Sequence, residues 1–190
     1  PITKQALLEK VAQMSELAQS TAKPDPLTGL SSLGALKREI DFRLFRSEAF
    51  AMCLVDVVGL GGVATEEAAA LKATILRRIA GAFGGMLKSA GFYETTLSHF
   101  GQGQFGVALP KEDLERFCGV MLTTFEQVVL TLQREKVGAQ AVDYSRLSVH
   151  IATVELSSER FQRSQEVLES TARALRGAKR DGQSKVVSSD

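Results

Sequence analysis

The segment Phe50–Val57 constrains the fold most, because it is a short apolar run interrupted only by Asp56. A continuous run of this length predicts a central strand that is buried on both faces of a sheet. Gly59, Gly61 and Gly62 follow the run and end the strand. The rest of the chain must therefore supply neighbouring strands and the helices that cover them.

Helices are predicted wherever apolar residues recur at steps of three or four. They cover residues 3–20, 31–46, 65–89, 111–136 and 163–179. Ser31 or Ser32 is expected to cap the second of these helices. Its predicted inward face consists of Leu33, Leu36, Ile40, Leu44 and Phe45. In the last helix, Leu168, Leu175 and Ala178 are expected to face inward.

Further strands are predicted at residues 93–100, 105–109 and 147–156, with a short closing strand at 185–187. A glycine-bearing hairpin, Gly101–Gln104, joins the first two of these. From the central strand onward the order is β-α-β-β-α-β, which predicts an α+β, ferredoxin-like (split βαβ) antiparallel sheet with flanking helices, plus an N-terminal helix. We expect residues 1–22 to form a linker or signalling helix and residues 23–190 to form the domain.

The chain has 190 residues with 44% hydrophobic residues, and its 23 basic and 22 acidic side chains nearly balance. This composition predicts a globular protein without a strong field for nucleic acid. The sequence contains no apolar run long enough to cross a membrane. Cys53 and Cys118 lie in apolar patterns and are expected to be reduced core residues of a cytoplasmic protein.

Four segments occur in the order found in the GGDEF family of diguanylate cyclases, which the chain resembles over roughly residues 25–187. Asp25–Leu30 is similar to the DxLTGL motif, and Leu54–Asp56 falls where the family's first strand carries a metal-binding aspartate. His99–Phe105 stands at the signature hairpin. Ala174–Gly182 is similar to the ALYxAKxxG helix end. The resemblance implies the joining of two GTP molecules into cyclic di-GMP with the help of metal ions.

The same resemblance implies that most of the reacting groups are missing, leaving a vestigial nucleotide site. Its residues are Asp56, Gly101, Gln102, Gly103, Gln104, Phe105 and Lys179. Asp56 is the one retained candidate metal ligand, although a strand-end aspartate also caps loops. Gly103 stands where a second metal-binding carboxylate is expected, and the neutral Gln104 replaces the adjacent glutamate. Hard cations need such anionic oxygens, so no metal site and no catalytic residue is expected.

Other positions that the resemblance assigns to nucleotide binding are also changed. Gln102 replaces a glycine beside which the nucleotide passes, and its side chain is expected to intrude there. The remaining replacements are Val58 for an acidic residue, Gly61 for a lysine, Ala64 and Ala73 for two guanine-binding residues, and Gln183 for an arginine. Phe105 is more typical of a buried core than of function. Lys179 is expected either to touch a phosphate or only to favour the helix dipole.

An inhibitory RxxD site for the product is expected shortly before the hairpin in this family. Lys88 and Gly91 occupy its two ends here, and neither can replace the arginine or the carboxylate. His99 and His150 have no cysteine or carboxylate at metal-ligand spacing in the sequence, so both are expected to be structural.

These patterns predict a non-catalytic GGDEF-like module that acts by protein–protein interaction in a bacterial cyclic di-GMP related pathway. The expected partners are other signalling or motility proteins, with self-association through the N-terminal helix, and no cofactor. The alternative is a domain that binds GTP with Mg²⁺ without turnover and regulates an attached or partner phosphodiesterase. Residual cyclase activity is the least favoured reading.

Overall fold

The computed structural model describes residues 23–60, 66–135, 137, 143–156, 160–178 and 185–189. The described elements are α2 (Leu33–Phe45), β1 (Phe50–Val58), α3 (Glu66–Ser89), β2 (Ser98–His99), β3 (Gln104–Pro110), α4 (Leu114–Arg134), β4 (Ser148–Leu156), α5 (Ser164–Ala178) and β5 (Lys185–Ser189). Two short 3-10 helices, η1 (Lys111–Asp113) and η2 (Tyr144–Arg146), precede α4 and β4. The predicted helix at 3–20 lies outside the described residues.

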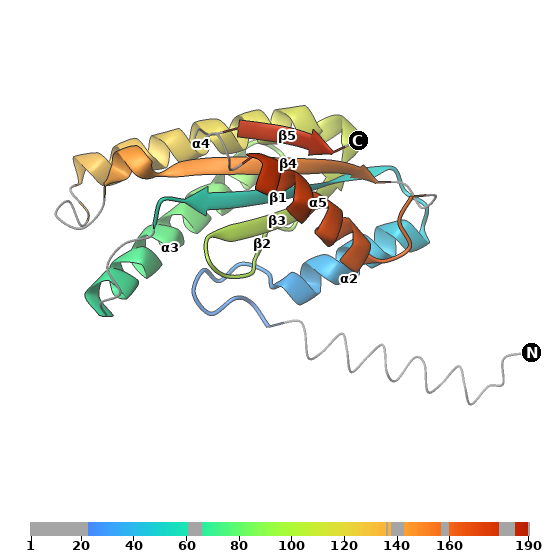
Figure 1. Ribbon diagram of the computed structural model, residues 1–190, viewed down its shortest axis with the longest axis horizontal. Coiled ribbons are helices and arrows are strands. Elements are labelled where there is room, and N and C mark those ends of the chain that lie inside the picture. Colours follow the sequence, from blue (N-terminus) through green and yellow to red (C-terminus); the bar gives the residue numbers. More distant parts are fainter. Residues whose placement is uncertain are drawn as a thin grey trace, which may run out of the picture.

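The strands form one sheet in the order β2-β3-β1-β4-β5 (Figure 1). β1 lies in the middle and pairs antiparallel with both β3 and β4, while β5 pairs parallel with β4 at the edge. The arrangement of β1, β3 and β4 around two connecting helices is the split βαβ unit. The predicted α+β class, the antiparallel sheet and its flanking helices are therefore confirmed.

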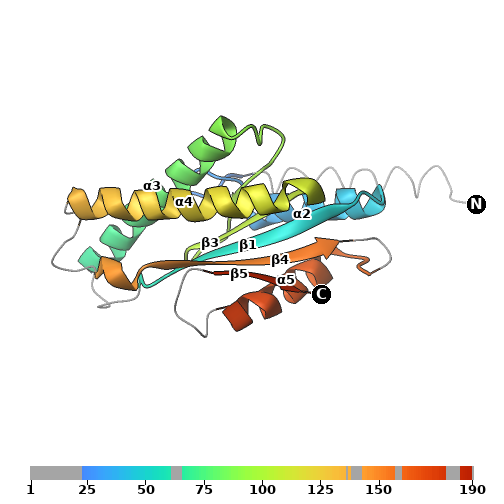
Figure 2. The same ribbon diagram turned by 90° about the horizontal axis from the view of Figure 1, so that it is seen from above.

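Helices cover both faces of the sheet (Figure 2). Val55 and Val57 of β1 point into a core that also contains buried residues of α3 and α4. Met52 and Leu54, which alternate with them, point into a second core shared with α2 and α5. This alternation follows from the pleat of a strand, and it decides on which face each functional side chain of β1 lies.

Local chemistry explains where α2 begins. Ser32 is its N-cap, and the Ser32 hydroxyl accepts a hydrogen bond from the backbone N–H of Ala35 at 3.4 Å. Leu36, Ile40 and Leu44 are buried as expected. Phe45 was also expected to face inward, but it is 88% exposed. The buried positions of α2 repeat every four residues from Leu36, which leaves Phe45 on the outer side of the helix.

One further expectation is corrected. The predicted strand 93–100 shrinks to the two residues of β2, because Phe92 and Leu97 insert into the core while the backbone between them turns. In α5, Leu168 is half-buried and packs against the core as expected, while the neighbouring Val167 is fully buried. Leu175 is buried as expected.

Cys53 of β1 and Cys118 of α4 are both buried free thiols in the core under α3 and α4. Burial, together with the hydrogen bond that the Cys53 thiol donates to Cys118, raises the pKa of Cys53 well above its usual value. No helix within the described ranges is long and apolar enough to cross a membrane.

Candidate functional site

The retained aspartate lies at the end of β1, on the sheet face that α2 and α5 cover. Asp56 is 2% exposed, and its cross-strand partners are Gln104 of β3 and His150 of β4. Side chains that are directly opposite in an antiparallel pair have Cβ atoms about 4.5–5.5 Å apart. A carboxylate, an amide and an imidazole are thus brought side by side, and the His150 Nε2 lies 3.2 Å from the Ser148 hydroxyl.

This group is poor in anionic oxygen. Of its members only Asp56 carries a carboxylate, and Gln104 contributes a neutral amide. Among the described residues, no cluster of three or more histidine, cysteine, aspartate or glutamate side chains has a geometry that could hold a metal ion. Divalent cations such as Mg²⁺ prefer several anionic oxygen ligands, so the described side chains do not fit a bound magnesium.

The hairpin before β3 turns through three successive left-handed residues. Gly101, Gln102 and Gly103 have φ values of 95°, 53° and 83°. The backbone N–H of Gln104 donates to the carbonyl of Gly101 at 2.9 Å. Positive φ at both central residues is the mark of a type I′ turn, which matches the twist of paired strands. The exposed Gln102 is the non-glycine residue in this strained turn.

Gly103 has no room for a side chain. A Cβ atom built on it would lie 2.7 Å from the carbonyl oxygen of Val57 and 3.6 Å from the Leu76 side chain. The approach is close because the backbone N–H of Val57 donates to the Gly103 carbonyl at 3.0 Å. The position expected to carry the second metal-binding carboxylate is therefore both glycine and sterically closed.

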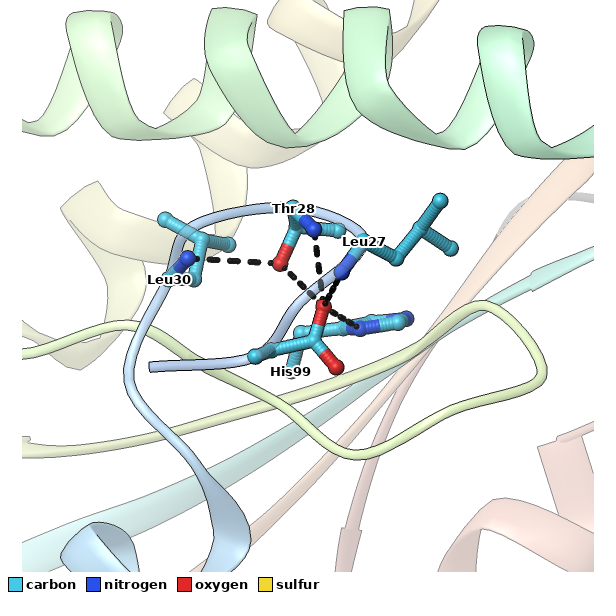
Figure 3. A network of polar contacts seen from close by, with 5 residues as sticks. Leu27, Thr28, Leu30 and His99 are labelled. Carbon is cyan, nitrogen blue, oxygen red and sulfur yellow. Dashed lines mark hydrogen bonds and ion pairs between the residues drawn. The ribbon is translucent and has the colours of Figure 1, made fainter. Parts of the chain in front are cut away.

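The turn at residues 25–30 is built around one carboxylate oxygen, as Figure 3 shows. Asp25 Oδ1 accepts hydrogen bonds from the backbone N–H and the hydroxyl of Thr28, both at 2.8 Å, and from the backbone N–H of Leu27 at 3.2 Å. His99 Nδ1 lies 2.9 Å from the same oxygen. Burial raises the pKa of Asp25, but the hydrogen bonds from Thr28 and His99 outweigh it and hold the pKa below the usual 3.8.

His99 links this turn to the hairpin. Its ring is 2% exposed and lies 4.9 Å from the ring of Phe105, which in turn meets Phe83 edge-on at 5.5 Å. The backbone N–H of His99 also donates to Ser31 at 2.9 Å. Phe105 is fully buried, as expected for a core residue.

Sequence reasoning missed that each histidine has a carboxylate neighbour. Both pairs are far apart along the chain. The turn at residues 25–30 packs Asp25 against His99, and the pairing of β1 with β4 places Asp56 opposite His150. The GGDEF resemblance placed Asp25 and His99 in two motifs, which was the available signal that they belong together.

Lys88 and Gly91 form a helix end. Lys88 is exposed in the last turn of α3. Gly91 follows with a φ of 84°, and its backbone N–H donates a hydrogen bond to the Lys88 carbonyl at 3.1 Å. The N–H of Phe92 bonds to the carbonyl of Leu87 at 2.9 Å. A left-handed glycine with such bonds is a helix C-cap, which gives this pair a structural role.

Of the other predicted positions, Val58 ends β1 and Ala73 lies half-buried on α3. Lys179 lies outside the described residues, as do Gly61, Ala64 and Gln183. A cavity of about 430 Å³ between α2 and α5 includes Gln104 in its lining. Its charged lining residues are Lys37, Glu169 and Arg176.

Comparisons with known proteins give a structural match. No model of a known protein family matches the chain, and no curated protein matches it. Several solved structures do. The coiled coil and GGDEF domain of DgcB from Caulobacter crescentus, in complex with c-di-GMP, is 19% identical, with a TM-score of 0.65 over 97% of this chain and 95% of that one.

The diguanylate cyclase SiaD of Pseudomonas aeruginosa, in complex with its activator SiaC, is 21% identical and has a TM-score of 0.68 over 98% of this chain and 73% of that one. The S helix-GGDEF-EAL structure of LapD from Vibrio cholerae, bound to c-di-GMP, is 14% identical, with a TM-score of 0.65 over 96% of this chain and 41% of that one. Identities this low establish the fold alone. The chain therefore has the fold of a GGDEF domain.

Proposed function

We propose that this protein is a non-catalytic GGDEF-like module that acts by binding other proteins in a cyclic di-GMP related pathway. One observation carries the proposal: the hairpin position expected to supply the second metal-binding carboxylate is Gly103, and the Val57 carbonyl closes it to any side chain. A single carboxylate, Asp56, is too little to hold the metal ions that neutralise a triphosphate.

The remainder of the domain supports a function that depends on a stable fold rather than on catalysis. Both faces of the sheet have a buried apolar core, and the turn at residues 25–30 has a network of polar contacts that includes His99. A sheet buried on both faces and a satisfied turn are what a stable interaction module requires. Under this proposal the protein works in the cytoplasm, needs no cofactor, binds no nucleic acid and inserts into no membrane. Residues 1–22 act as its signalling helix, and self-association through them is part of the proposal.

The alternative is GTP binding without turnover, in control of an attached or partner phosphodiesterase. It is favoured by the cavity next to Gln104, because the two cations Lys37 and Arg176 outnumber the single carboxylate, Glu169, in its lining. An anionic nucleotide suits such a pair of cations.

A calorimetric titration with GTP and with cyclic di-GMP in the presence of Mg²⁺ separates these functions. The proposed module gives no saturable heat with either ligand and forms no product on long incubation with GTP. Saturable GTP binding that Arg176→Gln weakens would support the alternative. Product formation that Asp56→Asn abolishes would refute the non-catalytic function.

A further inference from the structure

The outer side of α2 carries one basic and two aromatic residues in a single line. Arg38, Phe42 and Phe45 follow one another at steps of four and three, so they share a face of the helix; we call them the outer stripe. Phe42 is 53% exposed and Phe45 is 88% exposed. Large aromatic side chains left in water on one face are typical of a surface that another molecule covers.

Arg38 and Phe42 of the outer stripe line a hollow on the surface. A cavity of about 320 Å³ is lined by Arg38, Glu39 and Phe42 of α2 and by Thr96, which precedes β2. The Nη1 atom of Arg38 is buried and has no hydrogen-bond partner among the described residues. A guanidinium nitrogen withdrawn from water without a partner is costly, so the hollow favours an anion.

The nearby carboxylates do not neutralise Arg38. Glu39 is engaged by Arg43, whose Nε lies 2.6 Å from the Glu39 Oε1. Glu48 pairs with Arg46 at 3.0 Å, and the Arg46 guanidinium sits over the Phe42 ring at 5.4 Å. Glu39 and Glu48 are thus each paired with another arginine, and Asp41 is hydrogen-bonded to Ser164.

We propose that the outer stripe is a docking surface for an acidic protein segment, whose carboxylate pairs with Arg38 while its apolar side chains cover Phe42 and Phe45. This rests on the proposed function as a protein-binding module and names the partner's chemistry. Guanidinium binds carboxylate through two parallel hydrogen bonds. A small free anion would satisfy Arg38 and leave both aromatic rings in water, so a protein segment fits the whole surface better.

A displayed library of random peptides, selected against the whole chain, provides the probe. Selected peptides are synthesised with a fluorescent label and their dissociation constants measured by polarisation. The test variants are Arg38→Gln and Phe45→Ala. Matched controls are Arg77→Gln on α3 and Leu130→Ala on α4, which replace an exposed arginine and a 51% exposed leucine away from the stripe. Thermal unfolding of each variant verifies that it folds.

We expect the selected peptides to share an aspartate or glutamate next to apolar residues. Each test variant should weaken binding by roughly tenfold or more, as should changing the peptide carboxylate to an amide, because a charge-assisted hydrogen bond or a buried aromatic contact is lost. The two control variants should bind within about twofold of the unchanged chain, since surface substitutions outside a contact have little effect.

Three results would overturn the inference. Peptides that bind equally well to Arg38→Gln and Phe45→Ala place the partner elsewhere, and the proposed function survives. Binding of inorganic phosphate or acetate at Arg38, with no peptide selected, makes the hollow a site for a small anion and counts against both proposals. Concentration-dependent dimerisation that Phe45→Ala abolishes makes the occupant a second copy of this chain.

Discussion

Gly103 offers the sharpest test of how the hairpin is built, because Gly101 provides a matched control two residues away. Both glycines have left-handed φ values, 95° at Gly101 and 83° at Gly103. A Cβ at Gly101 would meet nothing within 4 Å, whereas one at Gly103 would lie 2.7 Å from the Val57 carbonyl oxygen. Alanine at the two positions therefore shares the backbone strain and differs in the steric contact.

The expected magnitudes follow from this difference. Left-handed backbone costs an L residue about 1–2 kcal/mol, which is the whole expected loss for Gly101→Ala. In Gly103→Ala the hairpin must also move away from β1 and lose the bond from the Val57 N–H, which adds about 1–2 kcal/mol. The free energy of unfolding should therefore fall by about 2–4 kcal/mol in Gly103→Ala.

Urea unfolding of the two variants measures these values directly. With a slope of about 2 kcal/mol per molar urea, the midpoint of Gly103→Ala should lie roughly 0.5–1 M below that of Gly101→Ala. Equal midpoints would refute the claim that Val57 closes this position. The same reasoning expects Gly103→Glu to be destabilised without gaining cyclase activity, and product formation by that variant would contradict it.

The remaining predictions concern single residues. Because the folded-state pKa of Asp25 lies below 3.8, its carboxylate contributes stability that is fully present above about pH 5 and lost as the pH falls through the folded value; Asp25→Asn should flatten the decline seen in acid unfolding curves. Gln102→Gly should raise the free energy of unfolding by about 1 kcal/mol, since glycine adopts the φ of 53° without strain; a lower midpoint in urea would contradict this. Native alkylation followed by mass spectrometry should modify Cys118 before Cys53, because the hydrogen bond from Cys53 lowers the pKa of Cys118 while burial raises that of Cys53.

The sheet was predictable from local pattern because its central strand is unusually clear. Phe50–Val58 is buried along almost its whole length. The helices that cover the sheet show apolar residues at helical spacing. The segment 93–97 was not predictable in the same way. Phe92 and Leu97 anchor an irregular connection in the core, and a strand and a loop with two buried anchors have similar composition. Phe45 shows the same limit, since an apolar residue at helical spacing does not reveal whether a partner element covers it.

The sequence could identify the positions of the candidate site but not the contacts between them. Motif positions identified Asp56, Gly103 and Gln104, but spacing along the chain could not show that His150 stands opposite Asp56 in β4. Nor could it show that Gly103 is closed by the backbone of β1, because that contact depends on how the hairpin packs. A sequence shows which residue type stands at a motif position. Only the folded structure shows whether that position has space for a larger side chain.

The Asp25–His99 contact connects two segments that are far apart in the sequence. Asp25 organises the turn through which the chain enters the domain, and His99 directly precedes the hairpin. Because one carboxylate oxygen serves both Thr28 and His99, a displacement of the turn must alter the base of the hairpin as well. The contact thus connects the N-terminal side of the domain with this hairpin. If the proposed function as an interaction module holds, such a connection lets a change at one end alter the surface presented at the other.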